Sequence, residues 1–309
     1  MVHRVDPTLP RSTITLVSGG ATDVGKVRKV NEDSYLVAPG IVAVADGMGG
    51  HRAGDVASRM TIDACAELVT GEPLPIAAVE QLVSKANALV RAHAVEQDSM
   101  GMGSTLVGAV LVDNAGEDSL VVFNVGDSRC YATIDDGPLV QLTIDHSVVQ
   151  EMVDSGEISA EEARSHAHRN VVTRAIGIED FVAADFVVAP TGDRVRLFFC
   201  SDGVSGELSD AEIHRLLLEP GTPEEIASSV IDAVLQGSAK DNATAVVLDV
   251  IRTVSDLVDD QGASADDATG PRPRRIAEEQ QISIQTTPRA VEPLVSKVAS
   301  RRVIDEVPI

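Results

Sequence analysis

Residues 35–47, YLVAPGIVAVADG, contain two apolar runs separated by Pro39-Gly40. Both runs are rich in residues that favour strands, and a Pro-Gly pair favours a tight turn, so this stretch predicts a β-hairpin. The second run, residues 41–45, leads directly into Asp46-Gly47. A carboxylate is therefore expected at the end of the second strand of the hairpin.

Three other acidic motifs also stand where an apolar run begins or ends. Residues 197–201 lead out into Asp202-Gly203, whereas Asn31-Glu32-Asp33 and Asp241-Asn242 each precede such a run. In antiparallel sheets, the exits of some strands share an edge with the entrances of others. We therefore expect these carboxylates to gather at one edge, although they are far apart in the sequence.

The rest of the pattern predicts strands and helices that come in groups. Strand-like runs occupy residues 12–17, 104–112, 120–125, 129–134, 185–189, 194–201 and 243–251, and helical spacing occupies 53–69, 76–97, 147–155, 159–166, 210–218 and 223–235. Clustered strands with paired helices favour antiparallel sheets with helices on their outer faces. We predict an α+β fold, a sandwich of two antiparallel β-sheets flanked by helices in four layers (α-β-β-α), in which residues 104–134 form a meander.

The composition changes toward the C-terminus. From about Ser255 onward, Asp, Gln, Ser, Pro and Arg replace the apolar runs, which is typical of disordered segments. We therefore predict one folded domain over residues 12–252 and a disordered tail over residues 253–309.

The formal charge of −23 lies mostly on the predicted domain. Such a field repels nucleic acid and anionic membranes, and it also repels phosphorylated substrates unless bound cations reverse its sign locally. No run approaches the ~18 to 20 apolar residues that span a bilayer, and the N-terminus lacks a signal peptide. We expect a cytoplasmic protein with neither nucleic-acid nor membrane partners. The three cysteines, Cys65, Cys130 and Cys200, stand among apolar neighbours and are interpreted as core residues.

Carboxylates gathered at one edge suit hard divalent cations. Mg²⁺ and Mn²⁺ prefer oxygen ligands and keep several waters, so a few acids from distant strands can hold two ions, with one acid bridging them. Two ions about 3.5 to 4 Å apart can activate a bridging hydroxide for in-line displacement at phosphorus without a protein nucleophile. Arg28 stands three residues before Asn31, where its guanidinium can clamp two phosphate oxygens.

With these motifs in place, the chain resembles the metal-dependent Ser/Thr protein phosphatases of the 2C type, especially their bacterial branch. The resemblance covers residues 28–33 (RKVNED), 45–51 (ADGMGGH), 101–106 (GMGSTL), 126–129 (GDSR), 201–203 (SDG) and 241–244 (DNAT), in the family's order. It implies hydrolysis of phosphoserine and phosphothreonine in proteins by a two-metal, bridging-hydroxide mechanism that uses Mn²⁺ or Mg²⁺. It also implies phosphorylated proteins as partners, in opposition to bacterial Ser/Thr kinases.

The resemblance assigns the metal ligands residue by residue. It implies that Asp46 bridges two metals, that the Gly47 carbonyl ligates one of them, and that Asp202 and Asp241 complete the other. It further implies that Asp127 serves a third metal site that bacterial members contain.

The resemblance also implies roles around the metals. Arg28 would bind the phosphate, and Glu32 and Asp33 would orient metal-bound waters. Where eukaryotic members carry a His proposed to protonate the leaving group, this chain has Met48. The general acid therefore stays open between His51 and a metal-bound water.

Residues 145–170 resemble the family's mobile flap beside the active site. Gly156 is a candidate pivot, and Ser159-Ala160-Glu161-Glu162 has the pattern of a helix start. The alternative is an ordinary helical excursion without a gating role.

Three other functions compete with this interpretation. Residues 20–27, GATDVGKV, nearly match a nucleotide-binding P-loop, but Val27 replaces the required hydroxyl residue and the next motif leads into a strand instead of a helix. A cysteine-dependent phosphatase needs an Arg six positions after its nucleophile, and none of the three cysteines has one. A catalytically weak relative that only binds phosphorylated proteins is the remaining alternative. The presence of every expected acid favours the enzyme.

Overall fold

Two β-sheets lie face to face, and helices cover both outer surfaces. The computed structural model describes residues 11–49, 53–70, 73–114, 117–190, 192, 194–255 and 282–286. The strands are β1 (Arg11–Asp23), β2 (Asp33–Ala38), β3 (Ile41–Met48), β4 (Leu74–Pro75), β5 (Gly103–Ser104), β6 (Leu106–Asn114), β7 (Glu117–Val125), β8 (Arg129–Ile134), β9 (Val140–Gln141), β10 (Asp185–Val188), β11 (Arg194–Cys200), β12 (Ala243–Ser255) and β13 (Ile282–Thr286). The helices are α1 (Ala53–Ala66), α2 (Ile76–Glu96), α3 (Val148–Asp154), α4 (Ala160–Ser165), α5 (Asp202–Ser205), α6 (Asp210–Leu217) and α7 (Pro223–Gln236).

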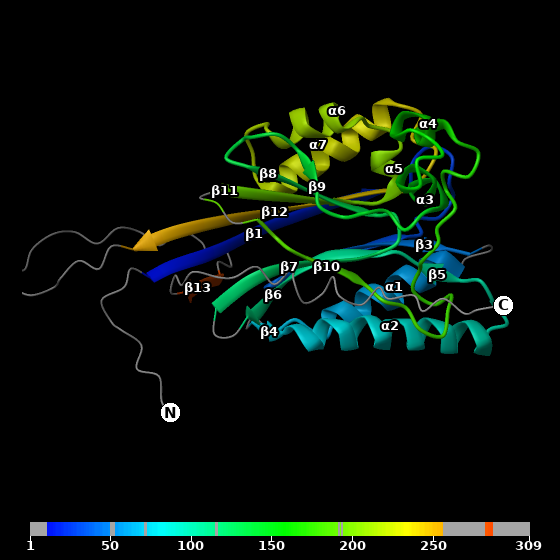
Figure 1. Cartoon of the computed structure of the whole chain (residues 1–309), viewed down its shortest axis with the longest axis horizontal. Helices are drawn as coiled ribbons and strands as arrows, with labels where there is room; N and C mark the ends of the chain where they lie inside the picture. The colour runs from blue at the N-terminus through cyan, green and yellow to red at the C-terminus, as the bar shows by residue number, and fades with distance from the viewer. Residues whose placement is uncertain are drawn as a thin grey trace, which may run out of the picture.

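The strand order separates the two sheets. One sheet runs β13-β1-β12-β11-β8-β9, and the other runs β10-β7-β6-β3-β2, with β4 beside β6 and β5 beside β3. Among these pairs only β4–β6 is parallel. Helices α6 and α7 cover the first sheet, and α1 and α2 cover the second, so that the four layers are visible edge-on (Figure 1). The predicted four-layer sandwich is confirmed.

The uninterrupted apolar run of β3 follows from the burial of both its faces. Ile41, Ala43 and Ala45 pack with the helices α1 and α2, whereas Val42 and Val44 point into the core between the sheets. β12 lies between β1 and β11 and is likewise buried on both faces. The free thiols are all buried, as predicted, at Cys65, Cys130 and Cys200.

β1 is longer than the strand predicted over residues 12–17. It continues to Asp23, which pairs with Ala243 of β12. Its glycines have weak strand propensity, so pairing with β12 and packing of α7 keep this part extended. A Cβ on Gly19 would lie 2.3 Å from the backbone N of Glu224, so α7 can approach only over a glycine. Because a turn and no helix follows Asp23, the P-loop alternative is excluded.

The meander predicted over residues 104–134 is wrong at its last strand. β6 and β7 are antiparallel neighbours, but β8 belongs to the other sheet, where it pairs with β11 and β9. The chain crosses between the sheets at Gly126, which has a φ of +109°. A Cβ on Gly126 would lie 2.7 Å from Thr105 Cγ2, so the sharp crossing needs a glycine. Strand propensity alone does not indicate which sheet a strand joins.

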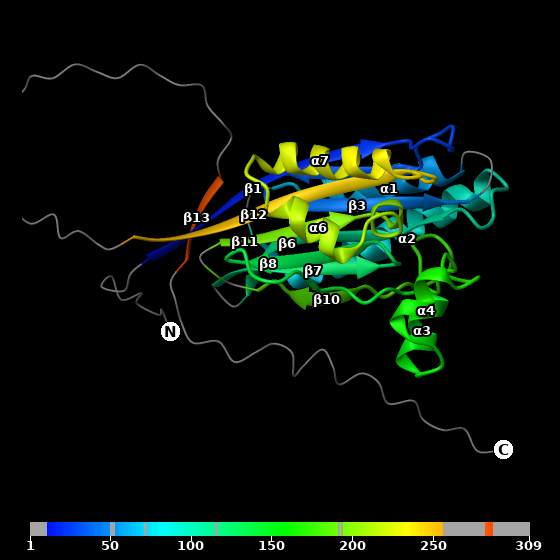
Figure 2. The ribbon, with the colours of Figure 1, turned by 90° about the horizontal axis from the view of Figure 1, so that it is seen from above.

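Helices α3 and α4 project from one end of the sandwich (Figure 2). Ser147 caps α3 by accepting from Gln150 N. Ser159 and Glu162 form a reciprocal capping box at α4, which confirms the helix start predicted there. Gly156, between the two helices, has a φ of +77°. Whether this excursion acts as a flap stays a prediction.

One strand lies within the predicted tail. β13 pairs antiparallel with residues 12–16 of β1. The rest of the chain after residue 255 lies outside the described residues, so the domain limits at 12 and 252 and the disordered tail stay predictions. Across the part of the chain that the structure describes, none of the helices combines the length and the apolar character needed to cross a membrane.

Candidate metal centre

The β2–β3 hairpin brings two of the predicted acids together. Its turn is at Pro39-Gly40, as predicted, and Gly40 has a φ of +77°. The register places Asp33 directly opposite Asp46. Directly opposite Cβ atoms in such a ladder lie about 5 Å apart. An acid at a strand entrance and an acid at a strand exit therefore share one edge.

Asp33 is buried and held by two hydroxyl groups. Ser201 Oγ and Thr244 Oγ1 each donate a hydrogen bond of 2.7 Å to Asp33 Oδ2. Burial, together with the charges of Asp202 and Asp241, raises the pKa of Asp33 to about 7 against the effect of these two hydrogen bonds. The other oxygen, Oδ1, is buried and has no hydrogen-bond partner among the described residues. Such an orphaned acceptor fits the predicted role of receiving a hydrogen bond from a metal-bound water.

Asp46, the predicted bridging ligand, is hydrogen-bonded to Asp202. Asp202 is the first residue of α5 and lies two residues after the end of β11. Burial and the charges of Asp33, Asp202 and Asp127 raise the pKa of Asp46 well above its usual range. Burial and Asp241 also raise the pKa of Asp202, but the hydrogen bond with Asp46 favours its ionised form. Both carboxyl groups therefore hold a proton more readily than a solvated aspartate does.

The other two predicted carboxylate ligands lie in the same electrostatic cluster. Asp127 is in the turn between β7 and β8 and is 8% exposed. Burial, followed by the charges of Asp202 and Asp145, raises the pKa of Asp127 to about 7. Asp241 lies two residues before β12, and its charge acts on both Asp33 and Asp202. The predicted ligands thus come together from separate parts of the chain.

Gly47, whose carbonyl is a predicted ligand, is buried where two chain segments approach closely. Its N–H donates to the Glu32 carbonyl at 3.0 Å. A Cβ on Gly47 would lie 2.0 Å from Gly54 O, so any other residue would push α1 away. Burial raises the pKa of the Glu32 carboxyl, and Arg28 opposes that shift. Glu32, predicted to orient a metal-bound water, and Gly47, a predicted ligand, are therefore fixed against each other.

Arg28 lies beside this acidic edge and stays open to solvent. Its Nη2 donates a hydrogen bond of 2.8 Å to Asp241 Oδ2, and its Nη1 lies 3.7 Å from Glu32 Oε2. The side chain is 46% exposed. A phosphate group from solution can therefore reach the guanidinium next to the predicted metal ligands.

The donor set fits divalent cations. Buried carboxylates that raise one another's pKa carry a repulsion that protons relieve in part and that divalent cations relieve more fully. Within the described residues, no three His, Cys, Asp or Glu side chains converge with ligand spacing on one point. Each ion would therefore also need backbone oxygens and water, which is usual for Mg²⁺ and Mn²⁺.

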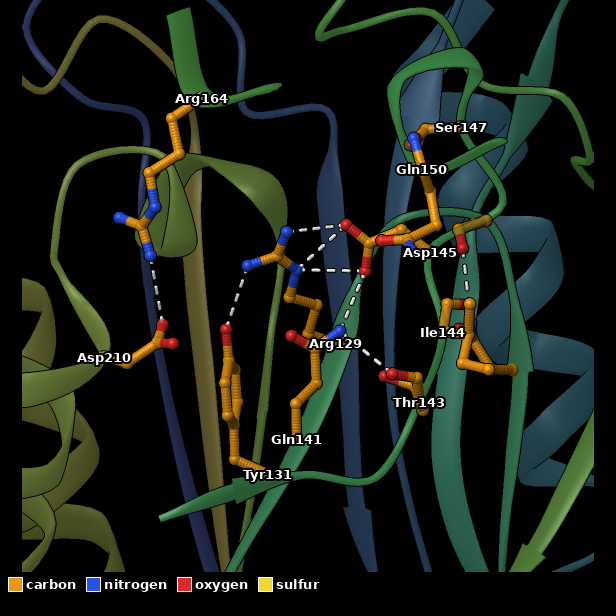
Figure 3. A network of polar contacts seen from close by, with 12 residues as sticks. Arg129, Tyr131, Gln141, Thr143, Ile144, Asp145, Ser147, Gln150, Arg164 and Asp210 are labelled. Atoms are coloured by element: carbon orange, nitrogen blue, oxygen red, sulfur yellow. Dashed lines mark hydrogen bonds and ion pairs between the residues drawn. The ribbon is translucent and has the colours of Figure 1, made fainter. Parts of the chain in front are cut away.

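A second charged network fixes the start of the α3–α4 excursion (Figure 3). Arg129 Nε lies 3.0 Å from both oxygens of Asp145, and its Nη2 donates to Oδ2 at 2.6 Å. Tyr131 OH accepts from Arg129 Nη1 at 3.1 Å, and Gln141 Nε2 donates to Asp145 Oδ1 at 3.1 Å. The network ties the beginning of β8 to the residue where the excursion leaves the sandwich.

Sequence reasoning missed the hydroxyl groups that support the acids. Ser201 and Thr244 hold Asp33, and Thr105 Oγ1 accepts a hydrogen bond of 2.9 Å from Asp46 N. Each hydroxyl stands inside a quoted motif, next to or near a strand end. A Ser or Thr that adjoins a strand-end acid was therefore the available signal. His51, the candidate general acid, lies outside the described residues.

Comparison with known proteins decides the family. The family model described as protein phosphatase 2C matches residues 26–236. The chain belongs to the protein phosphatase 2C family. The resemblance inferred from the six motifs is therefore confirmed, and the observed α+β sandwich is the fold expected of this family.

Two curated bacterial proteins are similar to this phosphatase 2C chain. The "Serine/threonine protein phosphatase PstP" of Mycobacterium tuberculosis is 39% identical over 247 residues, which are 79% of this chain and 46% of PstP. The "Serine/threonine phosphatase stp" of Listeria innocua is 38% identical over 241 residues, which are 74% of this chain and 93% of that protein. The chain thus spans about half the length of PstP and nearly all of the Listeria protein.

A solved structure similar to this phosphatase 2C chain contains metal. The catalytic domain of PstP was crystallised in complex with two manganese ions. It superposes with a TM-score of 0.68 at 38% sequence identity, covering 77% of this chain and 99% of that chain.

Proposed function

We propose that this phosphatase 2C chain hydrolyses phosphoserine and phosphothreonine in proteins with the help of Mn²⁺ or Mg²⁺. One observation carries the proposal. Four aspartates meet at one edge of the sandwich, beside the exposed guanidinium of Arg28, and their charges act on one another: Asp46, Asp127, Asp202 and Asp241. Uncompensated buried charges cost several kcal/mol each, about the range that bound cations can offset. An acidic edge of this kind, next to a phosphate-binding cation, supports phosphoryl chemistry.

The chain's own residues would hold the ions and the substrate. Asp46 would bridge two cations, with the Gly47 carbonyl on one and Asp202 and Asp241 on the other, and Asp127 would serve a third. When bound, the cations supply an activated water and neutralise charge on the phosphoryl group. The two-metal arrangement is supported by the PstP domain that was crystallised with two manganese ions.

Three further residues would prepare the displacement at phosphorus. Arg28 would bind two phosphoryl oxygens in bidentate fashion and so fix the direction of attack. The buried Asp33 Oδ1 and the Glu32 carboxylate would accept hydrogen bonds that orient water. No nucleophilic side chain is needed, because the attacking oxygen would come from water.

The proposed substrates are phosphorylated proteins, and the proposed cellular role is to oppose Ser/Thr kinases in cytoplasmic signalling. The names of the bacterial relatives support the class of substrate. Comparison of phosphoproteomes with and without the gene would identify individual substrates.

Hydrolysis of p-nitrophenyl phosphate and of a phosphothreonine peptide tests the proposal. We expect turnover with Mn²⁺, none after chelation, and little with a matched phosphotyrosine peptide. Asp46→Asn should abolish turnover while the protein stays folded. A chain that bound the phosphothreonine peptide without hydrolysing it under any metal condition would instead be a binding relative.

A further inference from the structure

The side chain of Asn242 braces the loop that carries Arg28. Asn242 is 4% exposed. Its Nδ2 donates to the carbonyls of Val24 and Val30, both at 3.0 Å, and its Oδ1 accepts from Glu32 N at 2.8 Å. Both amide donors and the amide oxygen are thus used to hold one short segment of the chain.

This amide closes the loop across its two ends. Residues 24–31 form neither helix nor strand, so hydrogen bonds outside the secondary structure must fix their path. A Cβ on Gly25 would lie 2.2 Å from Asp241 O, and Lys26 N donates to Ala239 O at 2.8 Å. The loop therefore lies directly against residues 239–242, and Asn242 joins both of its ends to that support.

We propose that Asn242 is a positioning residue that holds Arg28 where the guanidinium can bind the phosphoryl group of the substrate. This inference rests on the proposed function. A free Arg side chain carries about 2 kcal/mol of rotamer entropy, and half-exposed Arg28 has little packing to restrict it. A fixed backbone on both sides of Arg28 reduces the conformational entropy that is lost when phosphate binds.

Another buried asparagine of this chain, Asn87, is a matched control that distinguishes a positioning role of Asn242 from a merely structural one. Asn87 on α2 is 3% exposed and makes the same three kinds of hydrogen bond. Its Nδ2 donates to Glu179 O at 3.0 Å and Asp180 O at 3.3 Å, and its Oδ1 accepts from Gly177 N at 2.7 Å. Asn87 therefore braces a different loop, one that carries no predicted ligand.

The first experiment compares Asn242→Ala with Asn87→Ala in the Mn²⁺-loaded protein. We expect both variants to lower the Tm. Asn242→Ala should raise the KM for p-nitrophenyl phosphate and the Kd for inorganic phosphate, measured by calorimetry, about tenfold, with kcat changed less than about threefold. Asn87→Ala should leave KM and Kd within about twofold. Unchanged KM and Kd in Asn242→Ala, or equal increases in both variants, would overturn the inference.

The second experiment asks whether Asn242 acts through Arg28. In an Arg28→Ala background, the further change Asn242→Ala should raise KM less than about twofold, because the guanidinium to be positioned is already gone. Full additivity of the two changes would overturn the inference. If Asn242→Ala does not fold, Asn242→Ser is measured in the same way. Absence of Mn²⁺-dependent hydrolysis by the wild-type chain would contradict the proposed function itself. Failure of the proposed function can therefore be distinguished from failure of the inference about Asn242.

Discussion

Ser201 Oγ donates a hydrogen bond of 2.7 Å to Asp33 Oδ2 and accepts one of 3.0 Å from the backbone N of Thr244. A single hydroxyl thus joins the end of β11, the start of β12 and the acid that begins β2. Hydrogen bonds to a carboxylate favour its ionised form, so Ser201 lowers the pKa of Asp33 against the effect of burial.

Ser201→Ala should therefore shift the acid limb of the activity profile. Without the hydroxyl, the pKa of Asp33 rises further above its present value of about 7, so kcat/KM falls off at higher pH than in the wild type. The lost buried hydrogen bonds should also cost about 1–3 kcal/mol in the free energy of unfolding. Ser228→Ala, which removes an exposed hydroxyl on α7, is the control. An unshifted acid limb would argue against this role for Ser201.

The metal-free protein should be more stable near pH 5 than near pH 8. Burial raises the pKa values of Asp33 and Asp127 to about 7 and that of Asp46 well above its usual range. Unfolded Asp titrates near pH ~3.9, so between about pH 4 and 7 the folded state binds more protons than the unfolded state. The free energy of unfolding therefore decreases as the pH rises through this window. Acids with lowered pKa values, such as Asp185 at about 2, act mainly below it.

The measurement is the Tm of chelator-treated protein across this range, with and without added Mn²⁺. Saturating Mn²⁺ should remove most of the decrease, because the cations compensate the ionised aspartates. A metal-free Tm that is constant or higher near pH 8 would contradict the charge coupling described here.

Arg28→Ala should weaken binding more than turnover. Removal of a phosphate clamp raises KM, whereas kcat falls less if Arg28 binds the ground state and the transition state about equally. Arg28→Lys keeps the charge but loses the bidentate geometry, so its KM should lie between those of the wild type and of Arg28→Ala. Steady-state kinetics with p-nitrophenyl phosphate distinguish the cases. A large fall in kcat at constant KM would instead assign Arg28 to the transition state.

Asp145→Asn should destabilise the fold far more than Asp210→Asn does. Asp145 is 8% exposed and pairs in bidentate fashion with Arg129, so the variant leaves a largely buried guanidinium without its counter-charge, at about 3 kcal/mol or more. Asp210 lies 3.5 Å from Arg164, and both side chains are more than half exposed, so that pair contributes about 0–1 kcal/mol. Urea denaturation measures the free energy of unfolding of both variants. Equal decreases for Asp145→Asn and Asp210→Asn would contradict this prediction.

The parts of the fold that local pattern determines were predicted correctly. The Pro39-Gly40 hairpin and the capping box that starts at Ser159 each follow from a few neighbouring residues. The gathering of the acids at one edge was also predicted, because the beginnings and ends of strands can be recognised in the sequence.

What the sequence could not reveal depends on tertiary register. β8 joins the sheet of β11 and β12, and not that of β6 and β7, because Gly126 turns the chain sharply against Thr105, a contact between residues that no local pattern connects. The partners of Asn242 stand more than 200 positions earlier in the chain. A buried amide or hydroxyl near a strand end shows that support is needed, but only the fold identifies what it supports.

Calorimetric titration of Mn²⁺ into the folded, metal-free protein near pH 7 tests the central claim most directly. We expect uptake of about two ions per chain, together with proton release that is visible as a dependence of the heat on the buffer, because the ions compete with protons for carboxylates whose pKa values burial raises. Asp46→Asn should lose most of this uptake while its Tm is maintained. Folded wild-type protein that takes up neither Mn²⁺ nor Mg²⁺ would contradict the account.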